Sequence, residues 1–205
     1  GIVDSIPKLV ARRIIEPALA ADDAPRIRCQ EGTLERLLGE LAVHRLDLVL
    51  SDQPLPPGLN VKAYGYVLGE SGTSFFVSAD LYERYQGDFP AVLDGAPMLL
   101  PTQGTALRRR LEEWFESRGL VPIVAAEFDD SALLKAFGEA GAGVFAGPTA
   151  IAEEICRTYT ARVIGSTEEV TERFYALSPE RRLKHPSVVA ITEAARVQLF
   201  GSGHH

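Results

Sequence analysis

The sequence has few cysteines and few histidines, the side chains on which disulfide scaffolds and many hydrolytic sites depend. It contains two cysteines in 205 residues, Cys29 and Cys156, and both lie in segments of apolar pattern. This placement predicts two buried free thiols rather than a disulfide, as in a cytoplasmic protein. Apart from the last two residues, the histidines are His44 and His185, and there is no G-x-S-x-G elbow. A Ser-His-Asp hydrolase is therefore not indicated.

The sequence also lacks a basic surplus and a long apolar run. Its net charge of −7 is the opposite of what a chain needs to hold a nucleic-acid backbone by itself. No apolar run approaches the roughly 18 residues of a membrane-spanning helix. Gly1-Ile2-Val3 resembles a core strand and not a signal peptide, so we expect no membrane association. The run 201–205 resembles a linker with the start of a histidine tag, and we expect a fragment of a longer protein.

What the sequence has is the composition and pattern of a globular α/β protein. It is 46% hydrophobic and 24% charged, and its 205 residues fit one large domain or two small lobes. The opening block predicts strands at 1–4, 26–31 and 46–50, with intervening helices capped by Ser5 and Thr33. Three strands joined by helices in this way run parallel, with right-handed crossovers.

A second α/β block follows a proline-rich loop. Strands are predicted at 61–68, 73–78, 98–100, 121–128, 144–146, 162–164 and 172–177, and helices at 105–119, 131–141, 149–159 and 187–200. In the second of these helices, Leu133, Leu134 and Phe137 form an apolar stripe, and Gly141 ends the helix. We therefore expect two α/β units in succession, with the last strand and helix rejoining the first unit.

Acidic and basic clusters occur close to the predicted ends of strands. Glu127, Asp129 and Asp130 can bind a metal or act as acid and base, although helix capping is the simpler explanation of their position. Asp52 follows the third strand, where it either contacts a ligand or holds the next turn. The arginines at 108–110 alternate with apolar leucines, which predicts a solvated helix face.

Hydroxyl side chains occupy several predicted turns that lead from a strand into a helix. They are Ser5, Thr33, Thr102, Thr105 and Thr149. Each of them fits a helix N-cap. Open α/β sheets bind ligands at the carboxyl edge, so the same hydroxyls can bind a small polar molecule without performing chemistry. The glycines between 138 and 147 do not have the G-x-G-x-x-G spacing, so no phosphate fingerprint is present.

These stretches resemble the effector-binding domain of LysR-type transcriptional regulators over residues 1–200. The opening block matches the β-α-β-α-β start of that family, and KAFGEAGAGV at 135–144 matches its later helix-glycine-strand motif. Within the family, the stretches 44–61, 127–148 and 174–186 are similar to sodium-responsive activators of sodium/proton antiporter genes.

The resemblance implies a two-lobed, periplasmic-binding-protein-like fold of type 2, each lobe being a mixed, mainly parallel sheet flanked by helices. Lobe I would comprise 1–72 with 175–200, and lobe II 73–174, with two crossover segments and an effector in the cleft between the lobes. A winged helix-turn-helix domain would precede this chain, and no cofactor or catalytic residue is expected. The implied effector-binding residues are Ser5, Thr33, Thr102, Gly104, Thr105, Phe128 and Asp129, with Asp52 as a candidate cation ligand.

The resemblance also implies head-to-tail pairing into a homodimer or tetramer, through one helix of each lobe. The implied interface residues are Leu9, Arg12, Arg13, Leu107, Arg110, Leu111 and Trp114. A ligand that binds one lobe arrangement better than another would shift their populations. The shift would alter how the full-length protein holds promoter DNA and RNA polymerase.

Two other functions fit the same fold. A solute-binding protein of a transporter would share it, although two unpaired cysteines argue against export. An enzyme resembling prephenate dehydratase would need a Thr-Arg-Phe motif, and TERF at 171–174 breaks that spacing, so we expect no turnover. The effector is left open between an organic anion and Na⁺ or Li⁺, which oxygens of Ser5, Thr33, Asp52 and Asp129 can bind if they converge.

Overall fold

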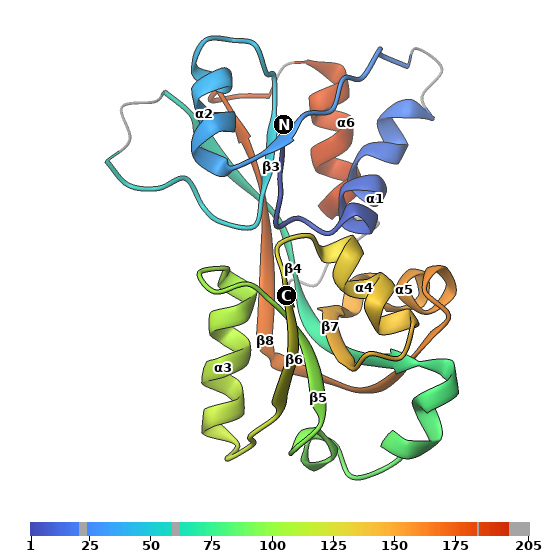
Figure 1. Ribbon diagram of the computed structural model, residues 1–205. Helices are drawn as coiled ribbons and strands as arrows, with labels where there is room; N and C mark the ends of the chain where they lie inside the picture. Colours follow the sequence, from blue (N-terminus) through green and yellow to red (C-terminus); the bar gives the residue numbers. More distant parts are fainter. Residues whose placement is uncertain (21–23, 59–61, 184, 197–205) are drawn as a thin grey trace. The chain divides into compact units, whose positions relative to one another are not determined.

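The chain divides into two compact units in the computed structural model, which describes residues 1–20, 24–58, 62–183 and 185–196 (Figure 1). Unit 1 comprises Gly1–Glu70 and Arg173–His205, and unit 2 comprises Ser71–Glu172. Two long strands, β4 (Tyr64–Ser78) and β8 (Ala161–Ser178), each contribute residues to both units. The run 201–205, predicted as a linker and tag, and the end of the predicted closing helix lie outside the described residues.

Unit 1 is built on three short parallel strands, as the sequence predicted. Strand β1 (Ile2–Val3) pairs in parallel with β2 (Glu31–Gly32) on one side and with β3 (Val49–Ser51) on the other. The C-terminal part of β8 then adds antiparallel to β3. The predicted strand at 26–31 is wrong over most of its length, because regular pairing begins only at Glu31. Cys29 in this stretch is a free thiol and exposed, so its predicted burial is also wrong, while Cys156 is free and half-buried.

Three helices cover the sheet of unit 1: α1 (Lys8–Leu19), α2 (Leu34–Ala42) and α6 (Pro186–Ala194), and α1 packs against α6 (Figure 1). Thr33 caps α2 as predicted, its hydroxyl accepting the Arg36 amide at 3.4 Å. Ser5 does not cap α1, because the helix starts after Pro7, which provides no side-chain cap. The buried faces are aliphatic, with Ile14 and Leu41 fully enclosed.

Unit 2 is a mixed sheet with the strand order β4-β7-β5-β6. Strand β5 (Pro97–Pro101) runs parallel to β6 (Ile123–Phe128) and to β7 (Val144–Pro148), and β4 is antiparallel to β7. The helices are α3 (Ala106–Ser117), α4 (Ser131–Glu139) and α5 (Ala152–Thr158), with 3-10 segments η1 (Ala79–Tyr85), η2 (Ala91–Leu93) and η3 (Thr149–Ile151). The strand pairs predicted at 61–78 and at 162–177 are single strands, β4 and β8.

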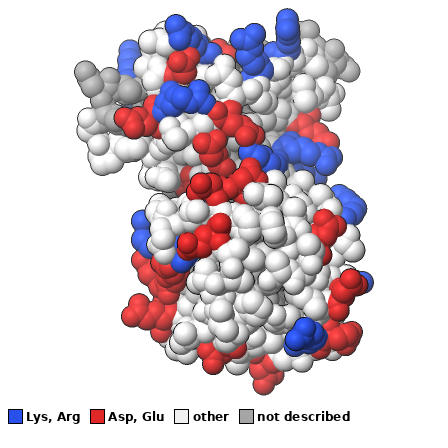
Figure 2. Space-filling view, in the orientation of Figure 1, with Lys and Arg blue, Asp and Glu red and all other residues white. Residues whose placement is uncertain are grey.

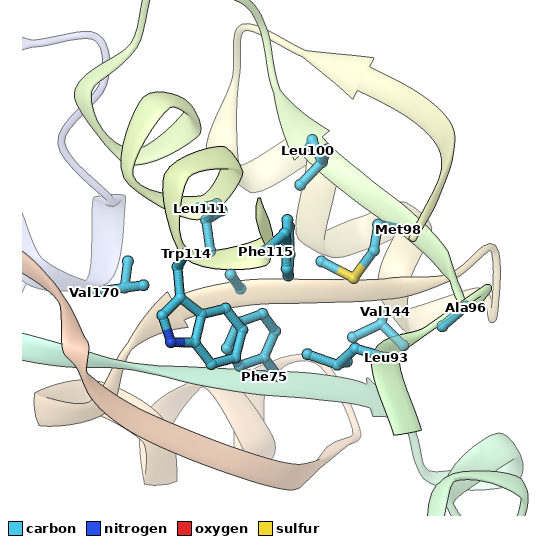
Figure 3. Close-up of a cluster of buried hydrophobic side chains, with 11 residues drawn as sticks. Phe75, Leu93, Ala96, Met98, Leu100, Leu111, Trp114, Phe115, Val144 and Val170 are labelled. Carbon is cyan, nitrogen blue, oxygen red and sulfur yellow. The ribbon is translucent and has the colours of Figure 1, made fainter. Parts of the chain in front are cut away.

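An aromatic cluster forms the core of unit 2 beneath α3 (Figure 3). The ring of Phe75 on β4 stacks on Trp114 of α3 with centroids 5.4 Å apart, and Phe115 and Phe89 lie against the same ring. The sequence pattern predicts Leu107, Leu111, Trp114 and Phe115 on one stripe of α3; the last three are buried here, and Leu107 is half-buried.

Helix α4 turns a different face to the sheet than its apolar pattern predicts. Leu133 and Phe137 are 51% and 46% exposed, whereas Leu134, Lys135 and Gly138 are buried. The reason is a close approach: a Cβ at Gly138 would lie 2.2 Å from the ring of Phe145 on β7. Only a glycine fits there, so this glycine, and not the larger apolar side chains, sets the rotation of the helix.

Candidate functional site

Polar side chains meet at the carboxyl ends of the parallel strands in unit 2. Thr102 follows β5, and Asp129 follows the neighbouring β6. The Thr102 hydroxyl donates to Asp129 Oδ1 at 2.5 Å, and the Thr102 amide donates to the carbonyl of Phe128 at 3.1 Å. The structure thus brings together three predicted effector-binding residues at one edge, with an exposed carboxylate among them.

The two helices that begin at this edge have side-chain caps. Thr105 caps α3 by accepting the Arg108 amide at 3.3 Å, and its hydroxyl donates to the Thr102 carbonyl at 3.2 Å. Gly104 supplies the turn before it, with φ +90°, which favours glycine. Asp130 caps α4 by accepting the Leu133 amide at 2.7 Å. Because Asp130 provides this cap, the side chain of the neighbouring Asp129 is directed to Thr102 instead.

A buried arginine, Arg108 of α3, is bonded to residues at the end of β5 and β6. The Arg108 guanidinium is bonded to Glu112 Oε1 at 2.6 Å, to the Pro101 carbonyl at 2.9 Å and to Glu127. Burial by itself would lower the pKa of Arg108, but the hydrogen bonds to Glu127 and Glu112 outweigh burial, so the pKa of Arg108 is raised. The hydrogen bond from Arg108 in turn lowers the pKa of Glu112. The prediction of a solvated face at 108–110 is wrong for Arg108. The Glu127 carboxylate, a predicted metal or acid-base group, is engaged in this ion pair.

A second buried cation lies at the same end of unit 2, and its burial was not predicted from the sequence. Lys135 of α4 is 4% exposed, and its ammonium donates to the Ser131 carbonyl at 3.1 Å. Burial lowers the pKa of Lys135 to about 8, an effect that the carboxylates of Glu172 and Asp130 partly offset. Positive charge in this region is therefore held inside the unit, and the acidic side chains Asp129 and Asp130 lie on its surface.

Three hydroxyls form a chain at the end of β7. Ser74 Oγ lies 2.9 Å from Thr149 Oγ1 and 2.8 Å from Ser166 Oγ. Thr149 was expected to cap a helix, but the residue in the cap position of the following 3-10 segment is Pro148. Thr149 therefore does not cap η3, and its hydroxyl is bonded to Ser74 of β4, which in turn links to Ser166 of β8.

The corresponding edge of unit 1 carries fewer polar groups. Ser5, Thr33 and Asp52 follow β1, β2 and β3, which are parallel and adjacent, so all three residues lie at one edge of that sheet. Thr33 is engaged in capping α2, and Ser5 and Asp52 are half-buried. Among the residues that the structure describes, no group of three or more His, Cys, Asp or Glu side chains is placed to hold a metal ion.

Some of the predicted interface residues are exposed or half-buried, and others are buried in the core of unit 2. On α1, Arg12 and Arg13 are exposed and Leu9 is half-buried; on α3, Leu107 and Arg110 are half-buried. Leu111 and Trp114 are 0% and 5% exposed inside the aromatic cluster, so they do not reach the surface of this chain. Within the described residues, no helix is long and apolar enough to cross a membrane.

Comparisons with known proteins agree on one family. The family model described as LysR substrate binding domain matches residues 1–199. The transcriptional activator protein NhaR of Escherichia coli (strain K12) is 34% identical over 200 residues, which are 98% of this chain and 65% of that protein, and NhaR of Shigella flexneri matches equally. The chain therefore spans 65% of the length of these curated relatives.

Solved structures similar to the chain show the same fold at lower identity. A reduced form of OxyR from N. meningitidis superposes with a TM-score of 0.70 at 14% identity, over 98% of this chain and 95% of that one. The effector binding domain of QuiR in complex with shikimate has a TM-score of 0.63 at 12% identity, over 95% and 92% of the two chains. The predicted α/β fold of the periplasmic-binding-protein-like type is thereby confirmed.

Proposed function

Because the chain belongs to the LysR substrate binding domain family, we propose that it is the effector-sensing part of a transcriptional activator similar to NhaR. One observation carries the proposal: in each unit, polar side chains stand at the carboxyl edge of parallel strands, and in unit 2 Thr102 and Asp129 are in direct contact there. Such edges bind small ligands in α/β proteins. The polar groups at these strand edges bind the effector in this proposal.

The effector that these groups suit first is an alkali cation, Na⁺ or Li⁺. Hard cations take carboxylate, hydroxyl and carbonyl oxygens. Unit 2 supplies such oxygens from Thr102 and Asp129, and unit 1 from Ser5, Thr33 and Asp52. The positive groups near the unit 2 edge, Arg108 and Lys135, are buried, which leaves the exposed charge there negative. A small organic acid is the second candidate, supported by the shikimate complex of QuiR.

The test is thermal unfolding of the chain in NaCl, LiCl and KCl at matched ionic strength. A ligand that binds only the folded state stabilises it by about 2.7 kcal/mol at a hundredfold excess over its Kd. We expect a higher Tm in sodium or lithium than in potassium, and loss of this difference in Asp129→Asn and in Asp52→Asn. Asp80→Asn, an exposed carboxylate at the start of η1, is the matched control.

Equal melting in all three salts would reject a cation effector for this chain. The same assay with shikimate then tests the second candidate, and Thr102→Val and Thr33→Val should weaken that binding. If neither kind of ligand stabilises the chain, the effector-sensing proposal fails.

Effector binding acts in this proposal by shifting the population of conformers in an oligomer that holds promoter DNA through an upstream domain. Strand β6 at the sheet edge of unit 2 supports self-association, because Ile123 and Val124 are 60% and 47% exposed, and Val121 before it 75%. Figure 2 shows uncharged side chains over the middle of unit 2 and charged ones around its border. Sedimentation equilibrium should show a dimer, which Ile123→Glu dissociates and Asp80→Asn, an exposed position on η1, leaves intact.

A further inference from the structure

Unit 1 contains a pocket away from the strand-end groups. Its volume is ≈ 270 Å³, near the lower limit of roughly 300 Å³ for ligand sites. It lies among β1, β3, the segment 25–29 and the start of α6. The apolar part of the lining includes Ile15, Ile27, Leu48, Leu50, Val188 and Ile191. None of Ser5, Thr33 or Asp52 lines it, so the pocket does not belong to the proposed effector site.

The pocket exists because the segment 25–29 does not pair as a strand. Regular pairing with β1 starts at Glu31, and the preceding residues place Ile27 half-buried and Arg26 and Arg28 exposed. Ile15 and Leu48 are likewise only half-buried, so apolar surface remains accessible inside the pocket. Covering such surface with an apolar ligand group is favourable, at about 25 cal/mol per Å².

Positive charge predominates in the polar part of the lining. Arg26, Arg28 and Arg45 supply the positive charge, Asp47 is the acidic residue, and His185 also lines the pocket. Arg45 is already paired with Glu40, at 3.5 Å on the surface. For Arg26 and Arg28, the described part of the chain shows neither a hydrogen bond nor an ion pair of the guanidinium group. Two guanidinium groups beside an apolar cavity therefore remain available to a ligand.

We propose that this pocket binds a small amphipathic carboxylate, with its apolar part against Ile27 and Leu48 and its carboxylate at Arg26 and Arg28. Guanidinium groups bind carboxylates through two parallel hydrogen bonds, which gives both strength and orientation. A neutral molecule of the same shape lacks that interaction, and an organic cation is repelled by the positive side chains. The pocket is a second ligand site, independent of the cation or organic acid proposed for the strand edges.

The probe is hexanoate, compared with hexanol and hexylammonium by isothermal titration and by methyl chemical shifts. We expect hexanoate to bind with at least tenfold higher affinity than either analogue, and the shifts to concentrate at Ile15, Ile27 and Val188. Arg26→Gln combined with Arg28→Gln should weaken hexanoate binding about tenfold or more, since bonds to charged groups are the strong ones. Arg109→Gln, an exposed arginine on α3 of unit 2, is the matched control.

A second variant tests the cavity instead of its charge. Ile27→Trp fills the space with an indole at a position outside regular secondary structure, so folding should persist, and hexanoate binding should be lost. Asp129→Asn should leave hexanoate binding unchanged, which separates this site from the strand-edge site. The proposal is overturned if hexanol binds as well as hexanoate, if the double arginine variant binds normally, or if the shifted methyls lie in unit 2.

Discussion

The two units of the chain differ in the polar and charged side chains that they bury. Among the described residues, the buried side chains that carry charge are Arg108, Lys135 and Glu172, and all three belong to unit 2. The buried polar residues of unit 1 are the neutral Ser51, Ser178 and Thr192. Unit 1 keeps its charged groups at the surface, whereas unit 2 encloses some of them beside its strand ends.

The apolar cores of the two units also differ in the type of side chain that they contain. Unit 2 contains an aromatic cluster in which one ring, Phe75, contacts three others, while the helices of unit 1 bury aliphatic side chains such as Ile14 and Leu41. The close packing of rings and glycines in unit 2 leaves little tolerance for added volume. Unit 1 retains a pocket of ≈ 270 Å³. The aromatic core of unit 2 should therefore be sensitive to changes in side-chain volume, and the stability of unit 2 should depend on pH through Lys135.

The largest expected effect is the loss of the central ring of unit 2. Phe75→Ala should lower the free energy of unfolding by about 3–5 kcal/mol, because it removes a fully buried aromatic side chain and leaves a cavity. The single tryptophan, Trp114, lies in this cluster, so urea unfolding followed by its fluorescence reports the change.

The control is Phe137→Ala in the same unit. Phe137 is 46% exposed and contacts the ring of Phe128, so its removal should cost only about 1 kcal/mol. Similar losses for the two variants would show that the aromatic cluster does not dominate the stability of unit 2.

The next effect concerns the buried ammonium of Lys135. Its pKa is lowered from 10.5 to about 8 in the folded chain, so between these values the unfolded chain binds a proton that the folded chain releases. Stability therefore rises with pH across this window, by about 3 kcal/mol at roughly 1.4 kcal/mol per unit.

Lys135→Met removes this dependence. The difference in unfolding free energy between the variant and the parent should be largest below pH 8 and should shrink by about 3 kcal/mol as the pH approaches 10.5. Chemical unfolding at a series of pH values measures it, with the surface variant Lys8→Met in unit 1 as the control. A difference that stays constant with pH would mean that the ammonium is not desolvated.

The smallest effect on stability is expected for a glycine-to-alanine substitution in each unit. Gly138→Ala places a methyl 2.2 Å from the Phe145 ring, and overpacking of this kind costs about 1–3 kcal/mol. Gly39→Ala in α2 meets nothing within 4 Å, and a glycine-to-alanine change in a helix interior gains about 1 kcal/mol. Opposite signs of the change in Tm are therefore expected, and a gain at both positions would refute the tight contact in unit 2.

The sequence predicted those parts of the fold and site that depend on local chemistry. Thr33, Thr105 and Asp130 cap their helices, because a cap involves an amide only three residues along the chain. The three parallel strands of unit 1 followed from the helices that connect them. The grouping of Thr102 with Asp129 was implied by the family resemblance, and in the structure both residues follow neighbouring parallel strands.

What depends on distant partners was not predictable from the pattern. The burial of Arg108 required Glu127, nineteen positions away on another strand, and a helical arginine without that partner would be solvated. The ammonium of Lys135 is buried because α4 lies against β7, and the pocket of unit 1 required the segment 25–29 to leave the sheet edge.

The sequence by itself determined most of the order of helices and strands, the caps at Thr33, Thr105 and Asp130, and the family, because periodicity and capping depend on residues close together along the chain. The tertiary structure alone decided which face of α4 is buried. Two leucines and a phenylalanine favour one rotation of that helix, but the contact of Gly138 with Phe145 imposes another. Steric exclusion acts over tenths of an ångström between residues far apart in sequence, and it outweighs the non-directional preference of apolar side chains for burial.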